Sequence, residues 1–138
     1  MNKSKGFQMN QTLLDLAIKA MKNAYAPYSN FRVGSAICSS NGKLYSGANV
    51  ENAAYPLGCC AETSAISAMV CDGEQQIAEI VIVGKGDNLV TPCGGCRQKI
   101  REFSMPETII NVCDPKGLRK TYTLQELLPD SFGPENIT

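Results

Sequence analysis

Apolar positions recur along this chain with a helical period in some segments and as continuous or alternating runs in others. In residues 10–24 they recur every three or four positions, which predicts an amphipathic helix. Residues 31–39 and 43–49 flank Asn41-Gly42, a pair suited to the positive φ angles of a tight turn, and so predict a β-hairpin. Residues 60–71 are rich in small and apolar side chains and predict a buried helix.

A central apolar strand organises the second half. Residues 77–84 contain the run Ile80-Val81-Ile82-Val83, which is typical of a strand covered on both faces. The remaining segments predict a helix at 92–103, strands at 107–113 and 118–123, and a short helix at 124–128. These elements predict an α/β fold, a three-layer α/β/α sandwich with a five-stranded mixed sheet. We expect a single domain over residues 1–138, with residues 1–9 as a loose basic tail.

Composition and charge exclude several classes of protein. Hydrophobic residues make up 43% of the chain and charged residues 19%, which excludes a disordered or collagen-like chain. No apolar run approaches the roughly 18 residues that a membrane helix needs, so we expect no membrane partner. The 13 Lys and Arg residues balance the 13 Asp and Glu residues, and this neutrality argues against a nucleic-acid partner, which attracts proteins with a basic excess.

The chain contains no histidine and seven cysteines. Without histidine, neither a Ser-His-Asp or Cys-His nucleophile nor an imidazole-bound metal is possible. The number of cysteines is odd, and the first residues, MNKSKGFQMNQ, lack the apolar stretch of a signal peptide. We therefore expect free thiols in the reducing cytoplasm rather than a disulfide framework.

Three of the cysteines stand at predicted helix starts. Cys60 begins one helix, and Cys93 and Cys96 lie three residues apart at the start of another, where the helix dipole favours thiolates. Three converging thiolates would bind Zn²⁺ and leave a fourth position for water, as in catalytic zinc sites. Bound water has a pKa lowered toward about 7, and Glu62 is close enough in sequence to move its protons.

Other interpretations of the cysteines remain open at this point. Cys93 and Cys96 alone could form a redox pair, and Cys59 could supply a fourth sulfur to a closed structural zinc site. Cys59 and Cys60 are adjacent, however, and the side chains of neighbouring residues diverge. We expect the three other cysteines to be small buried apolar side chains: Cys38, Cys71 and Cys113.

The pattern Cys-x-Glu followed by Pro-Cys-x-x-Cys is that of zinc-dependent base deaminases. From about residue 13 to residue 134 the chain resembles cytidine deaminase, in its small homotetrameric class with three cysteine ligands. The matching segments are 26–34 (APYSNFRVG), 49–56 (NVENAAYP), 60–62 (CAE), 92–98 (PCGGCRQ) and 126–134 (ELLPDSFGP).

The resemblance implies one zinc ion per chain, held by Cys60, Cys93 and Cys96, and hydrolysis of cytidine and 2′-deoxycytidine in pyrimidine salvage. It implies that zinc-bound hydroxide attacks C4 of the base and that uracil and ammonia form. Glu62 would take a proton from the zinc water, protonate N3, and later pass a proton to the leaving ammonia.

The resemblance also implies substrate contacts. Asn49 and Glu51 would bind the ribose 3′-hydroxyl, and their i, i+2 spacing on an extended segment puts both side chains on one face. Phe31 would pack against the pyrimidine, and the backbone N–H of Ala61 would bind a base oxygen. Without the cysteine motif, Asn49 and Glu51 could be a strand end and a solvated charge, and Phe31 a core residue.

Assembly is a further implication of the resemblance. Tyr55 and Phe132 correspond to aromatic residues that reach the site of a neighbouring subunit, so we expect a homotetramer with sites completed across subunits. Tyr55 could instead pack in the interface between subunits without contacting a substrate.

Three rival functions remain. A deaminase of the blasticidin type shares the zinc motif, but residues 31–34 and the pair Asn49 and Glu51 favour a plain nucleoside. The neutral charge and the absence of tryptophan argue against a nucleic-acid editing deaminase. A structural zinc module would need a fourth protein ligand and would not need Glu62.

One position departs from the family pattern. The residue after the glutamate is usually an arginine that hydrogen-bonds the zinc thiolates, and here it is Thr63. Three thiolates on Zn²⁺ carry a net charge of −1, which makes bound water less acidic unless another group compensates. The helix N-termini or Arg97 could provide that compensation.

If the site lacks compensation, Thr63→Arg should move the acidic limb of the pH–rate profile to lower pH, because the added charge makes the bound water more acidic. The measurement is kcat/KM against pH for the variant and the native protein. An acidic limb that does not move would contradict this hypothesis.

Overall fold

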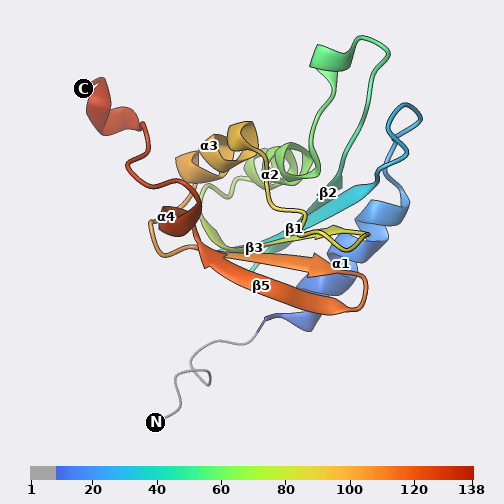
Figure 1. Ribbon diagram of the computed structural model, residues 1–138. Helices are drawn as coiled ribbons and strands as arrows, with labels where there is room; N and C mark the ends of the chain where they lie inside the picture. The colour runs from blue at the N-terminus through green and yellow to red at the C-terminus, as the bar shows by residue number, and fades with distance from the viewer. Residues whose placement is uncertain (1–8) are drawn as a thin grey trace.

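The computed structural model describes residues 9–138, so the tail predicted for residues 1–9 lies, except for Met9, outside the described residues. Five strands form one sheet in the order β2-β1-β3-β4-β5, in which β3 and β4 are parallel and all other neighbours antiparallel (Figure 1). This confirms the predicted five-stranded mixed sheet. The strands are β1 (Val33–Ser39), β2 (Leu44–Ala48), β3 (Ile77–Gly84), β4 (Ile109–Asp114) and β5 (Gly117–Thr123).

Helices cover both faces of the sheet. Helix α1 lies on one face, and α2 and α3 lie side by side on the other, which confirms the three-layer α/β/α arrangement (Figure 1). The helices are α1 (Gln11–Lys22), α2 (Ala61–Cys71), α3 (Gly94–Glu102) and α4 (Leu124–Leu127), with short 3₁₀ turns at η2 (Tyr55–Leu57) and η3 (Pro134–Asn136). No helix within residues 9–138 is both long and apolar enough to cross a membrane.

Strand β3 supplies side chains to two separate cores. Ile80 and Ile82 pack with residues of α2, α3 and α4, whereas Val81 and Val83 pack with α1 on the opposite face. All four side chains are fully buried. Successive side chains of a strand point to opposite faces, so a strand between two helical layers needs the continuous apolar run that the sequence shows.

Two glycines let the helices approach the sheet closely. A Cβ atom on Gly34 of β1 would lie 1.9 Å from the carbonyl oxygen of Ala17 in α1. On the neighbouring strand, a Cβ atom on Gly47 would lie 2.4 Å from the backbone nitrogen of Ala65 in α2. The helix backbones therefore rest directly on β1 and β2, on opposite faces of the sheet.

The prediction that three cysteines are buried is only partly right. Cys113 is buried in the α1 core, and Cys38 is partly buried against the same core. Cys71 is exposed, contrary to the prediction. Helix α2 buries the face that carries Ala65 and Met69, and Cys71, two residues beyond Met69 at the last position of the helix, lies off that face.

Gly47→Ala tests the contact between α2 and β2. The added methyl group forces α2 away from the sheet, and we expect the free energy of unfolding to fall by about 1–3 kcal/mol in urea denaturation. Gly95→Ala is the control, because a Cβ atom there meets nothing within 4 Å. A Gly47→Ala protein as stable as the native one would contradict this account of the packing.

Candidate active site

Backbone bridges at Val50 bring three segments of the chain together just before α2. Val50 and Cys59 exchange two backbone hydrogen bonds of 2.9 Å, and Val50 also forms a parallel bridge with Tyr25. Two further backbone hydrogen bonds, of 3.0 and 2.8 Å, join Tyr25 to the residues on either side of Val50. The segment after β2 therefore lies beside the chain that leads into Cys60.

The N-termini of α2 and α3 bring the three predicted cysteine ligands together. Cys60 is the N-cap of α2, Cys93 is the N-cap of α3, and Cys96 is the third residue of α3. Their Sγ atoms all lie within 4.8 Å of one another. Tetrahedral zinc with Zn–S bonds of ~2.3 Å holds its sulfurs about 3.8 Å apart, so this donor set fits a zinc ion after small side-chain movements.

Cys59 does not belong to this group. Among the described residues the sulfur cluster consists of Cys60, Cys93 and Cys96, while Cys59 is exposed and bridged to Val50 through its backbone. Neighbouring side chains of extended chain point to opposite sides, so Cys59 and Cys60 cannot both face the cluster. The structure thus favours an open three-sulfur metal site over a closed four-sulfur one or a simple redox pair.

The three thiols differ in acidity. Burial raises the pKa of Cys60 and that of Cys96, whereas the backbone N–H of Cys96 holds the pKa of Cys93 below its usual range. At neutral pH Cys60 and Cys96 are therefore protonated when no cation is bound. A metal ion that binds as a thiolate complex must displace their protons, so its affinity falls as the pH falls.

Glu62 is buried against the cluster without belonging to it. The residue is only 4% exposed, and this burial raises the pKa of its carboxyl group. Hydrogen bonds to its own backbone and to Cys96, together with the charge of Lys99, act in the opposite direction and lower that pKa. A buried carboxyl with a raised pKa is suited to accept a proton and to return it. Its neighbour Ala61 is the first residue of α2 and is buried, and its N–H has no acceptor within the helix.

Asn49 follows β2 and holds the loop that carries Phe31. Its Oδ1 accepts a hydrogen bond of 2.9 Å from the backbone N–H of Val33, and its Nδ2 donates one of 2.9 Å to the carbonyl of Phe31. The amide thus fixes the backbone on both sides of Arg32.

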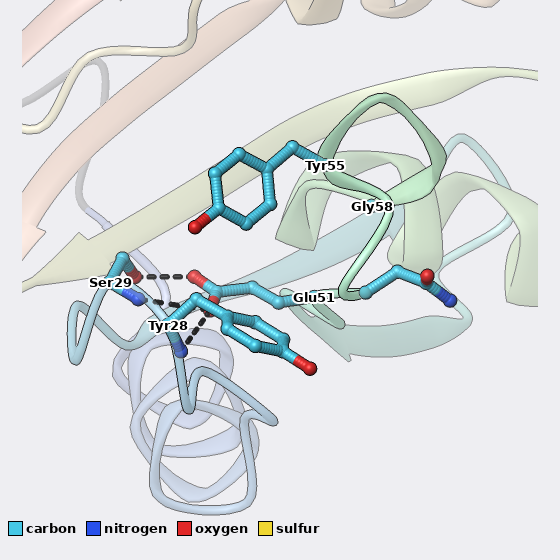
Figure 2. A pocket seen from close by; sticks show the side chains of 6 residues that line it. Tyr28, Ser29, Glu51, Tyr55 and Gly58 are labelled. Carbon is cyan, nitrogen blue, oxygen red and sulfur yellow. Dashed lines mark hydrogen bonds between the residues drawn. The ribbon is translucent and has the colours of Figure 1, made fainter.

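Glu51 binds the same loop a few residues earlier. Its carboxylate accepts a hydrogen bond from the Ser29 hydroxyl and two from backbone N–H groups, that of Tyr28 at 2.9 Å and that of Ser29 at 3.1 Å. These hydrogen bonds hold the pKa of Glu51 below its usual range. Figure 2 shows the carboxylate between the rings of Tyr28 and Tyr55, which line a cavity of about 320 Å³. The side chains of Asn49 and Glu51 thus both face residues 28–33, as their i, i+2 spacing predicts.

The predicted aromatic contacts are all accessible in the single chain. Phe31 is 44% exposed and lines a cavity of about 440 Å³ with the loop of residues 85–91. Tyr55 is 74% exposed on η2, with its ring centroid 5.9 Å from that of Tyr28. Phe132 is 58% exposed in the C-terminal segment, where its carbonyl accepts a hydrogen bond of 3.0 Å from Gln98.

A lysine that the sequence analysis missed lies next to Thr63. Lys99 donates a hydrogen bond of 3.0 Å from its Nζ to Oγ1 of Thr63, which links α3 to α2. The signal available in the sequence was spacing, because Lys99 follows Cys96 by one helical turn and so shares its side of α3. Arg97, which the sequence offered as a compensating charge, binds two backbone carbonyls and Thr91 instead.

Comparison with known proteins gives a consistent result. The family model of the cytidine and deoxycytidylate deaminase zinc-binding region matches residues 8–112. The cytidine deaminase of Sporosarcina psychrophila is 40% identical to this chain, in an alignment that covers 87% of this chain and 88% of that protein. The cytidine deaminase of Halalkalibacterium halodurans is 37% identical, in an alignment that covers 92% of this chain and 96% of that protein. The crystal structure of cytidine deaminase from Burkholderia pseudomallei is 37% identical, has a TM-score of 0.85, and is matched over 91% of this chain and 100% of that one.

The residues of the sulfur cluster and Glu62 all lie inside the matched region, and the relatives and the solved structure match nearly the whole chain. The chain therefore belongs to the cytidine deaminase family, with that family's zinc-binding region, and is a hydrolytic deaminase.

Proposed function

We propose that this protein hydrolyses cytidine and 2′-deoxycytidine to uridine and 2′-deoxyuridine with release of ammonia, as a step of pyrimidine salvage in the cytoplasm. One observation carries the proposal: a buried carboxyl, that of Glu62, lies against three converging sulfur atoms at two helix N-termini. This arrangement joins a metal site with an open position to a group that can move protons, which deamination by water requires.

Cys60, Cys93 and Cys96 would hold one zinc ion per chain as thiolates, and their number leaves one tetrahedral position for water. When bound, zinc would supply a Lewis acid that makes water nucleophilic at neutral pH. Glu62 would accept a proton from that water, deliver it to N3 of the base, and later return a proton to the leaving amine. Water would attack C4, the carbon that carries the amine.

The substrate would enter from the side of the loop that precedes β1. Asn49 keeps one amide hydrogen and one acceptor site beyond its two backbone hydrogen bonds, and the Glu51 carboxylate keeps acceptor sites beyond its three. These remaining sites can bind the ribose 3′-hydroxyl. Phe31 would stack on the pyrimidine, and the free N–H of Ala61 would bind a base oxygen.

We further propose a homotetramer in which neighbouring subunits complete each site. Tyr55 and Phe132 support this, because both are large apolar side chains left mostly exposed by the single chain, at 74% and 58%. Exposed aromatic side chains of this size are typical of interfaces.

Glu62→Gln should reduce kcat for cytidine by about 10²- to 10⁴-fold, because glutamine has nearly the same shape but cannot transfer a proton. Uridine formation is followed by ultraviolet absorbance, with zinc content and thermal unfolding measured on the same samples. Glu107→Gln is the control, since Glu107 is an exposed carboxyl before β4. Unchanged turnover in Glu62→Gln would overturn the assigned role.

Mixed assemblies test the sharing of sites between subunits. Phe132→Ala should lower kcat/KM by about 2- to 10-fold through loss of an aromatic contact. Refolding the Phe132→Ala protein together with the Glu62→Gln protein should give more activity than the sum of the two separate proteins. In a mixed assembly, a Glu62→Gln subunit supplies its native Phe132 to the site of a neighbouring Phe132→Ala subunit, whose Glu62 is intact. Mixtures that only reach the sum would contradict completion of the site by Phe132 of a neighbour.

A further inference from the structure

The site collects negative charge at the N-termini of α2 and α3. Three thiolates with one Zn²⁺ ion sum to a net charge of −1, and the buried carboxyl of Glu62 lies directly beside them. A buried charge without a partner is costly, so the fold should provide a cation within electrostatic reach.

Arg97 does not fill this role. It is the nearest arginine in sequence to the ligand pair, but its three donor nitrogens bind the carbonyl of Pro92 at 2.7 Å, the carbonyl of Leu127 at 3.0 Å and Oγ1 of Thr91 at 3.3 Å. The guanidinium thus ties the chain before α3 to the end of α4. It acts as a structural anchor for the loop that carries Cys93.

Lys99 has the required position. Its Nζ donates to Oγ1 of Thr63 at 3.0 Å, and Thr63 directly follows Glu62 in the first turn of α2. Lys99 itself lies one turn after Cys96, so its ammonium spans the gap between the two helices that carry the cysteines. The ammonium is also close enough to the Glu62 carboxyl to interact with it electrostatically.

We propose that Lys99 is the counter-charge of the metal centre and that the hydroxyl of Thr63 is the tether that holds its ammonium between α2 and α3. Lys99 is a positioning residue in this proposal, because it acts through Thr63 and through the field at the cluster and Glu62, without touching substrate. The inference rests on the proposed zinc site, and it gives Lys99, on a different helix, the compensating role that the family pattern gives to the arginine at the position of Thr63.

The sign of the effect on zinc follows from the net charge of the site. Zinc binds cysteines as thiolates and releases their protons, so the product formed with Cys60, Cys93 and Cys96 would carry a net charge of −1. A nearby ammonium favours the negative product. Removal of that charge should therefore weaken zinc binding and should not strengthen it.

The test compares Lys99→Gln with Lys99→Arg and with Lys116→Gln, which removes the same charge from an exposed lysine in the turn between β4 and β5. Zinc affinity is measured at neutral pH and low salt by competition with a chromogenic chelator. We expect Lys99→Gln to bind zinc about 3- to 10-fold more weakly, since Lys99 is exposed and partly screened. Lys99→Arg and Lys116→Gln should keep the native affinity.

Three further experiments separate a charge effect from a structural one. The difference between Lys99→Gln and the native protein should shrink at about 1 M salt, where charges are screened over roughly 3 Å. Thr63→Val should weaken zinc binding in the same direction but less, because the ammonium remains while its tether is lost. Native-like thermal unfolding of Lys99→Gln would show that the fold is intact.

The outcomes distinguish this inference from the proposed function. If Lys99→Gln binds zinc as tightly as Lys116→Gln does, the counter-charge role of Lys99 is overturned, whatever the activity. If the native protein binds zinc with the expected dependence on Lys99 but leaves cytidine unchanged, the proposed substrate is wrong and the role of Lys99 stands.

Discussion

The active site depends on how closely α2 approaches the sheet. The helix backbone at Ala65 rests on Gly47 of β2, where no side chain separates the two elements. Because α2 is only 11 residues long, this contact near its start also sets the position of its first turn. Cys60 and Glu62 thereby meet the cysteines of α3, and Glu62 is buried there, which raises the pKa of its carboxyl group.

A second constraint comes from the backbone that surrounds this turn. The bridges at Val50 hold the segment after β2 against the residues that precede Cys60. The groups proposed to bind the sugar and those proposed to activate water therefore belong to one connected frame. A shift of either part would be transmitted to the other through these hydrogen bonds, so the two groups of residues are mechanically linked.

The residue pattern predicted the layers of the fold and the grouping of the three cysteines better than it predicted the residues around them. The run in β3 indicated a strand buried on both faces, and the spacing of Cys93 and Cys96 indicated a helix start, because both features are local. Cys71 was placed in the core because its neighbours in sequence are apolar, but exposure depends on which face of α2 meets the sheet. Lys99 was missed because its partner, Thr63, lies 36 residues away on another helix.

Asn49 directly follows β2, where the pairing of β1 with β2 ends. Its amide group presents one donor and one acceptor to the backbone of Phe31 and Val33, as a peptide group of an adjacent strand would. The side chain of Asn49 thus takes the place of a peptide group and extends the hydrogen bonding of the sheet into the loop of residues 28–33. The loop is ordered while the protein folds, so a ligand that meets Phe31 bears little of the entropy cost of arranging it.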